Sequence, residues 1–157
     1  MRYGLFFLAV IILAFLELTL LDLARVFNIK PNLLLIGVVF AALAFELKWA
    51  ILFAMLSGAL KDIFSINPFG LNTVLFTLLG FFIFKLSRKI FLEDNLSRMI
   101  VAFAVVLFYD LAAALVFLFF GNFVSLGMFL RIGFLDSVYS ALCFPLLYKA
   151  VKPWISL

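Results

Sequence analysis

The sequence predicts an all-α integral membrane protein with six transmembrane helices in one bundle and both termini in the cytoplasm. Hydrophobic residues occupy 69% of the 157 positions and charged residues only 13%, with a mean hydropathy of +1.36. Soluble domains are apolar at only about half of their positions. The apolar runs also lack the strict polar and apolar alternation of a transmembrane barrel, so helices are expected.

Charged and turn-forming residues divide the chain into six apolar runs. We expect one transmembrane domain, residues 1–157, with spans at about 3–27, 31–45, 49–64, 71–86, 96–120 and 126–151. The second to fourth runs are shorter than the roughly 20 residues that cross a bilayer at right angles. They should therefore thin the bilayer locally or pack against longer neighbouring helices. The first run lacks a small-residue cleavage pattern and is interpreted as a retained span.

Local signals predict where the helices begin. Pro31 and Asn32 start the second helix, and Asn95 is positioned to cap the fifth. After the third helix, Asn67 is expected to cap the fourth, with Pro68 as the first helical residue.

The distribution of Lys and Arg predicts the orientation. With six spans, eight basic residues fall on the side of the termini and four on the other side. The larger group includes Lys85, Arg88 and Lys89, which follow the fourth span. We therefore expect this basic loop in the cytoplasm and the corner after the third helix outside. The loop is also compatible with binding a partner or anionic lipid.

A row of small residues runs along the third predicted helix and ends at an acid. Its members recur every four residues and so lie near one face, where another backbone can approach closely. Packing within the chain is the favoured interpretation, and a partner's helix is the alternative. Asp62 is expected to be partly hydrated, and either to bind a partner or to cap its own corner. The candidate partner-binding residues are Ala50, Ala54, Gly58, Asp62, Pro68 and Gly70.

Three acids, Glu17, Asp110 and Asp136, lie within the predicted spans. Each costs about 2.5 to 3.5 kcal/mol or more at the bilayer centre unless it is neutral, paired or hydrated. The favoured interpretation is that they are protonated or hydrogen-bonded to the hydroxyl groups of Thr19, Tyr109, Ser137 or Ser140. The alternative is a proton or cation path, or a polar ligand pocket. No basic residue is expected at their depth, which favours neutral carboxyls over a buried ion pair.

The composition argues against several other functions. Histidine is absent and Cys143 is the single cysteine, so this chain alone cannot build a disulfide, a zinc cage or His-based catalysis. No serine nucleophile with a base and no phosphate-binding loop occurs, so we expect neither an enzyme nor a cofactor or metal. The net charge of +4 comes from residues at helix ends, which indicates lipid head groups rather than nucleic acid.

A series of short motifs runs through the second to fourth spans. Its pieces are Lys30-Pro31-Asn32-Leu33-Leu34-Leu35, Gly58 with Asp62, Pro68-Phe69-Gly70-Leu71, Gly80, and the basic end from Lys85 to Lys89. In their order and spacing they resemble the MreD family of rod shape-determining proteins. Two places depart from the family pattern: Asn32, where the family often has Asp, and Ser65-Ile66-Asn67, where it commonly has a Gly.

The resemblance implies a non-enzymatic, multi-pass scaffold of the cell-elongation machinery in the bacterial inner membrane, which supports rod shape and side-wall peptidoglycan synthesis. It implies the single-pass protein MreC as the direct partner, and MreB, RodA and a class B penicillin-binding protein as indirect ones. It also implies a fold similar to the substrate-binding components of energy-coupling-factor transporters. A substrate-binding subunit of a vitamin or small-molecule transporter is therefore the alternative function.

Overall fold

The computed structural model describes Leu8 and residues 11–20, 31–65, 68–89, 94–121 and 125–155. All regular structure in these ranges is helical, as predicted. Residues 11–15 are α-helical and continue into the π-helical turn η1; we call residues 11–20 the N-terminal helix. The elements are η1 (Leu16–Leu20), α2 (Leu33–Ala44), α3 (Leu47–Phe64), α4 (Leu71–Ser87), α5 (Asn95–Phe119) and α6 (Leu126–Ile155). Each overlaps one of the six predicted apolar runs.

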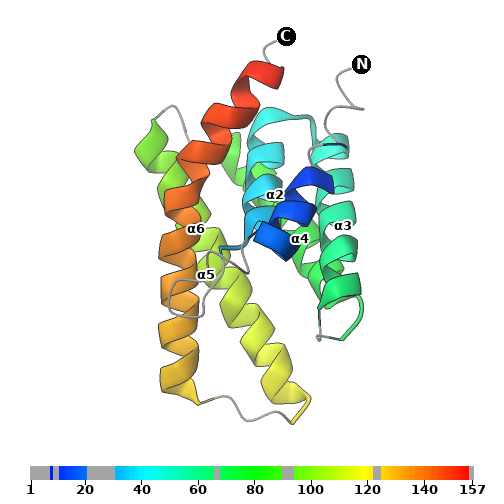
Figure 1. Cartoon of the computed structure of the whole chain (residues 1–157), viewed down its shortest axis with the longest axis vertical. Helices are drawn as coiled ribbons and strands as arrows, with labels where there is room; N and C mark the ends of the chain where they lie inside the picture. Colours follow the sequence, from blue (N-terminus) through cyan, green and yellow to red (C-terminus); the bar gives the residue numbers. More distant parts are fainter. Residues whose placement is uncertain are drawn as a thin grey trace.

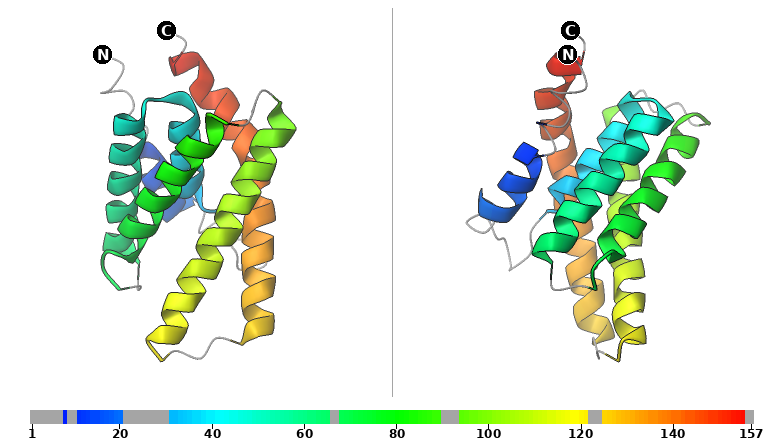
Figure 2. Two further views of the ribbon diagram at one scale, coloured as in Figure 1. Left: turned by 180° about the vertical axis from the view of Figure 1, so that it is seen from behind. Right: turned by 90° about the vertical axis from the view of Figure 1, so that its right-hand side faces the viewer.

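Two antiparallel hairpins, α3 with α4 and α5 with α6, form most of the bundle (Figure 1). The helix α2 lies between them and contacts all four of their helices. The hairpins also meet directly where α4 packs beside α5 (Figure 2). At one end of the bundle, α5 and α6 extend beyond the corner that joins α3 to α4 (Figure 1).

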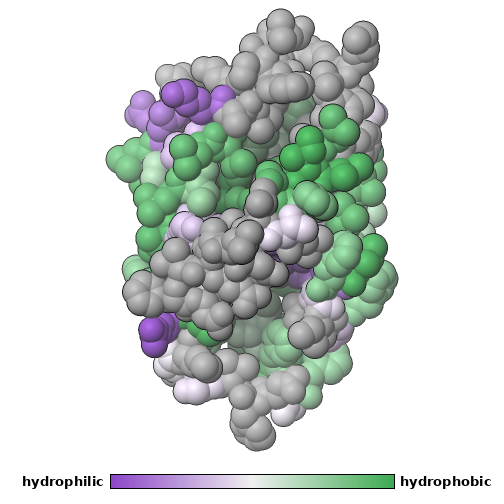
Figure 3. All heavy atoms as spheres, viewed as in Figure 1, coloured by the Kyte–Doolittle hydropathy of each residue, from purple (hydrophilic) through white to green (hydrophobic). Residues whose placement is uncertain are grey.

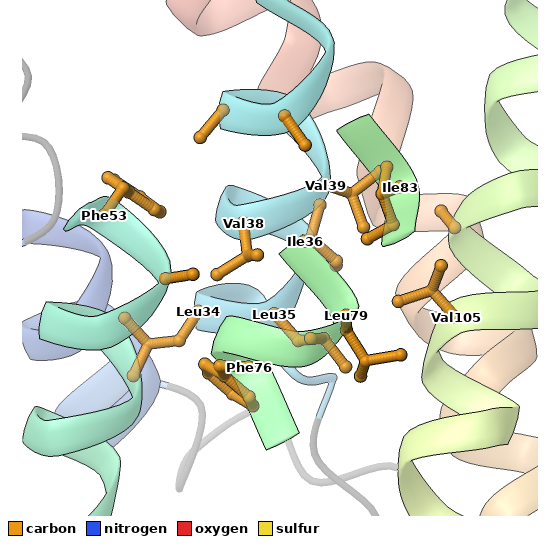
Figure 4. Packing of buried hydrophobic residues seen from close by; sticks show 14 of the residues in the cluster. Leu34, Leu35, Ile36, Val38, Val39, Phe53, Phe76, Leu79, Ile83 and Val105 are labelled. Carbon is orange, nitrogen blue, oxygen red and sulfur yellow. The ribbon is translucent and has the colours of Figure 1, made fainter. Parts of the chain in front are cut away.

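The core is built around α2. Ten consecutive residues of this helix, from Leu33 to Ala42, are buried. A helix that is apolar on all sides is stable only when other elements surround it, and here the two hairpins do so. Figure 4 shows side chains of α2 packed against side chains of α3, α4 and α5, among them Phe53, Phe76, Leu79, Ile83 and Val105.

Many large apolar side chains of the described residues are exposed, as expected for a chain in a lipid bilayer. Figure 3 shows one face that is mainly hydrophobic where it is coloured, with hydrophilic side chains gathered at the upper left, over the start of α5. By length and composition, Asn95–Phe119 and Phe129–Lys149 can each cross a membrane. The helices α2 and α4 are apolar but shorter, so six complete spans remain a prediction.

The predicted span of the fourth helix, 71–86, matches α4, but the predicted cap is wrong. The helix α4 begins at Leu71 rather than at Pro68, and Gly70 is its N-cap residue. Gly70 has φ = 97°, a left-handed conformation that glycine adopts without a steric penalty. Asn67, the expected cap, lies outside the described residues.

The other two predicted helix starts have different outcomes. The second helix starts at Pro31 and Asn32 as predicted, and Asn32 is its N-cap residue: the side chain accepts a hydrogen bond from the backbone N–H of Leu35 at 3.2 Å. The fifth helix differs by one position: Asp94 is the N-cap residue of α5 and makes no side-chain cap bond, and Asn95 is the first helical residue.

Candidate functional site

The helix α2 begins inside the bundle, about halfway along α6 (Figure 1). The backbone N–H of Asn32 donates to the hydroxyl of Ser140 at 3.0 Å, and Ser140 lies near the middle of α6. Both residues are buried. The first N–H groups of a helix have no partners within it, and in a bilayer no water supplies them. The start of α2 therefore needs polar side chains from other elements.

Glu17 supplies one of these partners. Its Oε2 accepts a hydrogen bond from the backbone N–H of Leu34 at 2.7 Å, while its Oε1 lies 3.1 Å from Nζ of Lys61. The N-terminus of a helix favours a negative charge. One carboxylate thus connects the N-terminal helix, α2 and α3.

This ion pair corrects the expectation that no basic residue lies at the depth of the acids. Lys61 comes near the end of α3, which suggested a position at the membrane surface, but its long side chain extends into the bundle. Its Nζ lies 5.6 Å from the ring centroid of Phe76 and 5.4 Å from that of Tyr109. The two aromatic faces attract the ammonium group, so it is held by three neighbours.

Asp62 caps the following helix rather than facing solvent. Its Oδ1 accepts from the backbone N–H of Asn72 at 2.9 Å, and its Oδ2 accepts from the backbone N–H of Thr73 at 3.0 Å and from the Thr73 hydroxyl. Only 3% of Asp62 is exposed, so the expected partial hydration is wrong and capping from within is the correct alternative. Because Asp62 provides these acceptors, α4 needs no cap from Asn67.

A second polar contact joins α4 to α5. The Tyr109 hydroxyl donates to Oδ1 of Asn72, and both residues are buried. The Tyr109 ring also packs edge-to-face on Phe76, with the centroids 5.5 Å apart. Within the described part of the chain, Nδ2 of Asn72 and Oγ of Ser57 have no hydrogen-bond partner.

Two of the three intramembrane acids, Glu17 and Asp136, lie near the start of α2, and Asp110 and Asp136 both interact electrostatically with Lys61. Asp136 accepts a hydrogen bond from the Ser140 hydroxyl at 3.1 Å, which agrees with the favoured interpretation and connects Asp136 to the start of α2. Asp110 faces α6: its β-carbon lies 3.4 Å from the position that a β-carbon on Gly133 would occupy. Among the described residues, Oδ2 of Asp110 has no partner, and no group of three metal-binding side chains comes together.

The row of small residues on α3 is covered by α4. Ala50 and Ala54 are 1% and 0% exposed, and a β-carbon on Gly80 of α4 would lie 3.1 Å from that of Ala54. A β-carbon on Gly58 would lie 2.5 Å from Cα of Thr73. The favoured interpretation, packing within the chain, is what the structure shows.

The remaining candidates lie at the two ends of the bundle. Pro68 is exposed and Gly70 partly exposed at the corner between α3 and α4. At the opposite end, Lys85, Arg88 and Lys89 are exposed. The ammonium of Lys85 lies 5.5 Å from the centroid of the Phe81 ring.

Lys61 and Asn72 were not predicted as members of a buried polar cluster, and Tyr109 was expected to bond an acid but donates to Asn72. A signal was present for the first two: Lys61 precedes an acid within an apolar run, and Asn72 lies inside the fourth run. Neither position specifies which helix its side chain will meet.

Comparison with known proteins identifies the family. The family model for the rod shape-determining protein MreD matches residues 1–152, which confirms the resemblance seen in the second to fourth spans. No curated protein matches the chain, and no solved structure does. The chain therefore belongs to the MreD family of rod shape-determining membrane proteins.

Proposed function

We propose that this chain is a non-enzymatic scaffold of the cell-elongation machinery in the bacterial inner membrane, and that it binds the single-pass protein MreC. The match to the MreD family over residues 1–152 carries the proposal. Through MreC, the chain acts alongside MreB filaments, RodA and a class B penicillin-binding protein in side-wall peptidoglycan synthesis. Its termini and the basic loop lie in the cytoplasm.

The internal contacts support a scaffold because they fix the relative positions of five elements. Glu17 ties the N-terminal helix to α2 and α3, and Asp62 ties α3 to α4. Tyr109 then ties α5 to α4. A protein that holds a partner's helix in one geometry benefits from such rigidity, because a rigid protein loses less conformational entropy when the partner binds.

The docking surface that we propose for MreC is the outer corner, defined as Ile63, Phe64, Pro68, Phe69 and Gly70. Since α4 covers the row of small residues, a partner cannot use that row without displacing α4. The outer corner, by contrast, has large exposed side chains: Phe69 is 80% exposed, Ile63 62% and Phe64 60%. Aromatic side chains are common anchors of protein interfaces.

Detergent pull-down of MreC with the tagged chain tests this proposal, with yields normalised to the chain present in the membrane. We expect Phe69→Ala to reduce the recovery of MreC. Phe82→Ala is the matched control, because Phe82 is also exposed, at 63%, but lies within α4 and away from the corner. Normal recovery with Phe69→Ala, and loss with Lys85→Ala plus Arg88→Ala, would place the interface on the cytoplasmic side instead.

One observation favours the alternative, a substrate-binding subunit of a vitamin or small-molecule transporter. Helices that begin within the bilayer often place their N-termini at the substrate site of a transporter, and α2 begins inside the bundle. In this chain, however, Glu17 already occupies that N-terminus. A small molecule that co-purifies with the wild-type chain would support the transporter function over the scaffold.

A further inference from the structure

We propose that the exposed face of α4 and the basic residues at the end of this helix form a binding site for one anionic phospholipid. The apolar part of the site is the α4 stripe, defined as Val74, Leu78 and Phe82, and its charged part is the basic end, defined as Lys85, Arg88 and Lys89. The inference goes beyond the proposed function, since it requires a protein that lies in a bilayer and does not require MreC.

The α4 stripe lies on the side of the helix that faces away from the core. Its three members are four residues apart, so their side chains lie near one face of α4. Val74 is 57% exposed, Leu78 50% and Phe82 63%. Phe76 and Ile83 of the same helix are buried instead. Acyl chains can therefore lie along the stripe.

The distance from the stripe to the basic end matches one leaflet of a bilayer. Val74 and Lys85 are eleven positions apart, which is roughly 16 Å at 1.5 Å per residue. The hydrocarbon core of a bilayer is about 30 Å thick, so each leaflet contributes about 15 Å. With Lys85 at the head groups, the stripe extends along the acyl chains of that leaflet.

The basic end holds its charges close to the apolar surface. All three of its residues are exposed. The ammonium of Lys85 lies 5.5 Å from the centroid of the Phe81 ring, and the guanidinium of Arg88 lies 5.0 Å from that of Phe84. Contacts of this kind keep a cation at the boundary between hydrocarbon and head groups. Within the part of the chain that the structure describes, no carboxylate forms an ion pair with Lys85, Arg88 or Lys89.

An anionic phospholipid is complementary to both parts of the site. Its phosphate can accept two hydrogen bonds from the guanidinium of Arg88 and a further one from a lysine, while its acyl chains contact the stripe. A zwitterionic lipid such as phosphatidylcholine carries a positive group next to its phosphate, which the basic end repels. A lipid with a net negative charge, such as phosphatidylglycerol, is therefore the ligand.

Quenching of tryptophan by brominated lipids measures which lipid lies at the stripe. The reporter is the full-length chain with Phe82→Trp, Trp49→Phe and Trp154→Phe, so that its single tryptophan lies on the stripe. It is reconstituted in mixed vesicles in which either phosphatidylglycerol or phosphatidylcholine is brominated, at equal mole fraction and with the same acyl chains. We expect an affinity for phosphatidylglycerol about fivefold higher or more, the order that one basic residue contributes at an anionic surface.

Single substitutions in the reporter locate the binding site. Lys85→Gln and Arg88→Gln should each lower the preference for phosphatidylglycerol several-fold. Lys48→Gln is the matched control, because Lys48 is also exposed and lies at the same end of the bundle, at the start of α3, but outside the site. It should leave the preference unchanged. Each variant keeps the other basic residues and therefore the orientation that they direct.

Two results would overturn the inference. Equal quenching by the two brominated lipids would show that the stripe does not select an anionic lipid. An equal loss of preference in Lys48→Gln and Lys85→Gln would show a general attraction of this end of the bundle instead of a site. If the reporter does not insert, the ratio of the two lipids that co-purify with Lys85→Gln and Lys48→Gln in the otherwise wild-type chain decides between the same outcomes.

Recovery of MreC separates this inference from the proposed function. Lys85→Gln should lose the lipid preference and still recover MreC in the detergent pull-down. A variant that loses MreC but keeps the preference for phosphatidylglycerol would assign the basic end to a protein partner, and would overturn the inference.

Discussion

Gly58 on α3 packs directly against the backbone of Thr73 on α4. A β-carbon at position 58 would lie 2.5 Å from Cα and 2.8 Å from the backbone nitrogen of Thr73, which is closer than non-bonded carbon atoms approach. Unlike a flexible side chain, the backbone of a packed helix cannot move aside cheaply. The two helices therefore meet at a point where only glycine fits.

The first prediction follows from this contact. We expect Gly58→Ala to destabilise the protein by about 1 to 3 kcal/mol through overpacking, measured by thermal unfolding in detergent and by yield in the membrane. Gly127→Ala on α6 is the matched control, because nothing lies within 4 Å of its β-carbon position, and it should not lose stability. Unchanged stability of Gly58→Ala would show that α3 and α4 do not pack this closely.

The second prediction concerns the cap that Asp62 provides. Removing the carboxylate leaves the N–H groups of Asn72 and Thr73 without their acceptor, so Asp62→Ala should cost about 1 to 3 kcal/mol. Its control is Asp94→Ala at the start of α5, since Asp94 is exposed and makes no side-chain cap bond. We thus expect a lower yield of Asp62→Ala itself, and not a selective loss of MreC at normal yield. Equal unfolding midpoints for the two variants would contradict the cap.

The third prediction tests the link between α4 and α5. Tyr109→Phe removes the hydroxyl that donates to Asn72 and should destabilise the protein by about 1 kcal/mol or somewhat more. A double-mutant cycle with Asn72→Ala isolates the contact, because the two losses should not add if the groups interact. Strictly additive losses would mean that the hydroxyl and the amide are not coupled.

The fourth prediction separates two of the intramembrane acids. Asp110→Asn should retain stability, since an amide has nearly the volume of a carboxyl group and Oδ2 of Asp110 has no hydrogen-bond partner among the described residues. Glu17→Gln should lose about 1 to 3 kcal/mol, because Lys61 would remain buried without its counter-ion. Unfolding midpoints in detergent compare the two, and a greater loss in Asp110→Asn would refute this assignment.

The fifth prediction is topological. Reporter fusions at either terminus and in the loop between Arg88 and Arg98 should be active in the cytoplasm, and a reporter inserted near Asn67 should be active outside. The distribution of basic residues carries this expectation. A reporter near Asn67 that works only in the cytoplasm would exclude the model of six spans.

The sequence was sufficient to predict the helical class and the approximate position of each helix. Apolar runs separated by charges and by Pro31 or Gly70 leave few other arrangements in a bilayer, where backbone groups must pair within their own segment. It was also sufficient for the packing of Ala50, Ala54 and Gly58, because small residues at this spacing admit a second helix.

The polar cluster could not be predicted in the same way, because its partners are far apart in the sequence. Lys61 meets Glu17 where α2 begins inside the bundle and the N-terminal helix packs beside it. The N-terminal cap of α4 has a similar cause, since the N–H groups of Asn72 and Thr73 donate to Asp62 on α3. Local signals predict caps only when the capping group is local.

Native mass spectrometry of the wild-type chain, co-expressed with MreC and released gently from the membrane, tests the proposed scaffold most directly. We expect a species that contains the 17.8 kDa chain together with MreC, and no additional bound small molecule other than phospholipid. A 17.8 kDa chain that carries a small-molecule adduct and never associates with MreC would contradict it.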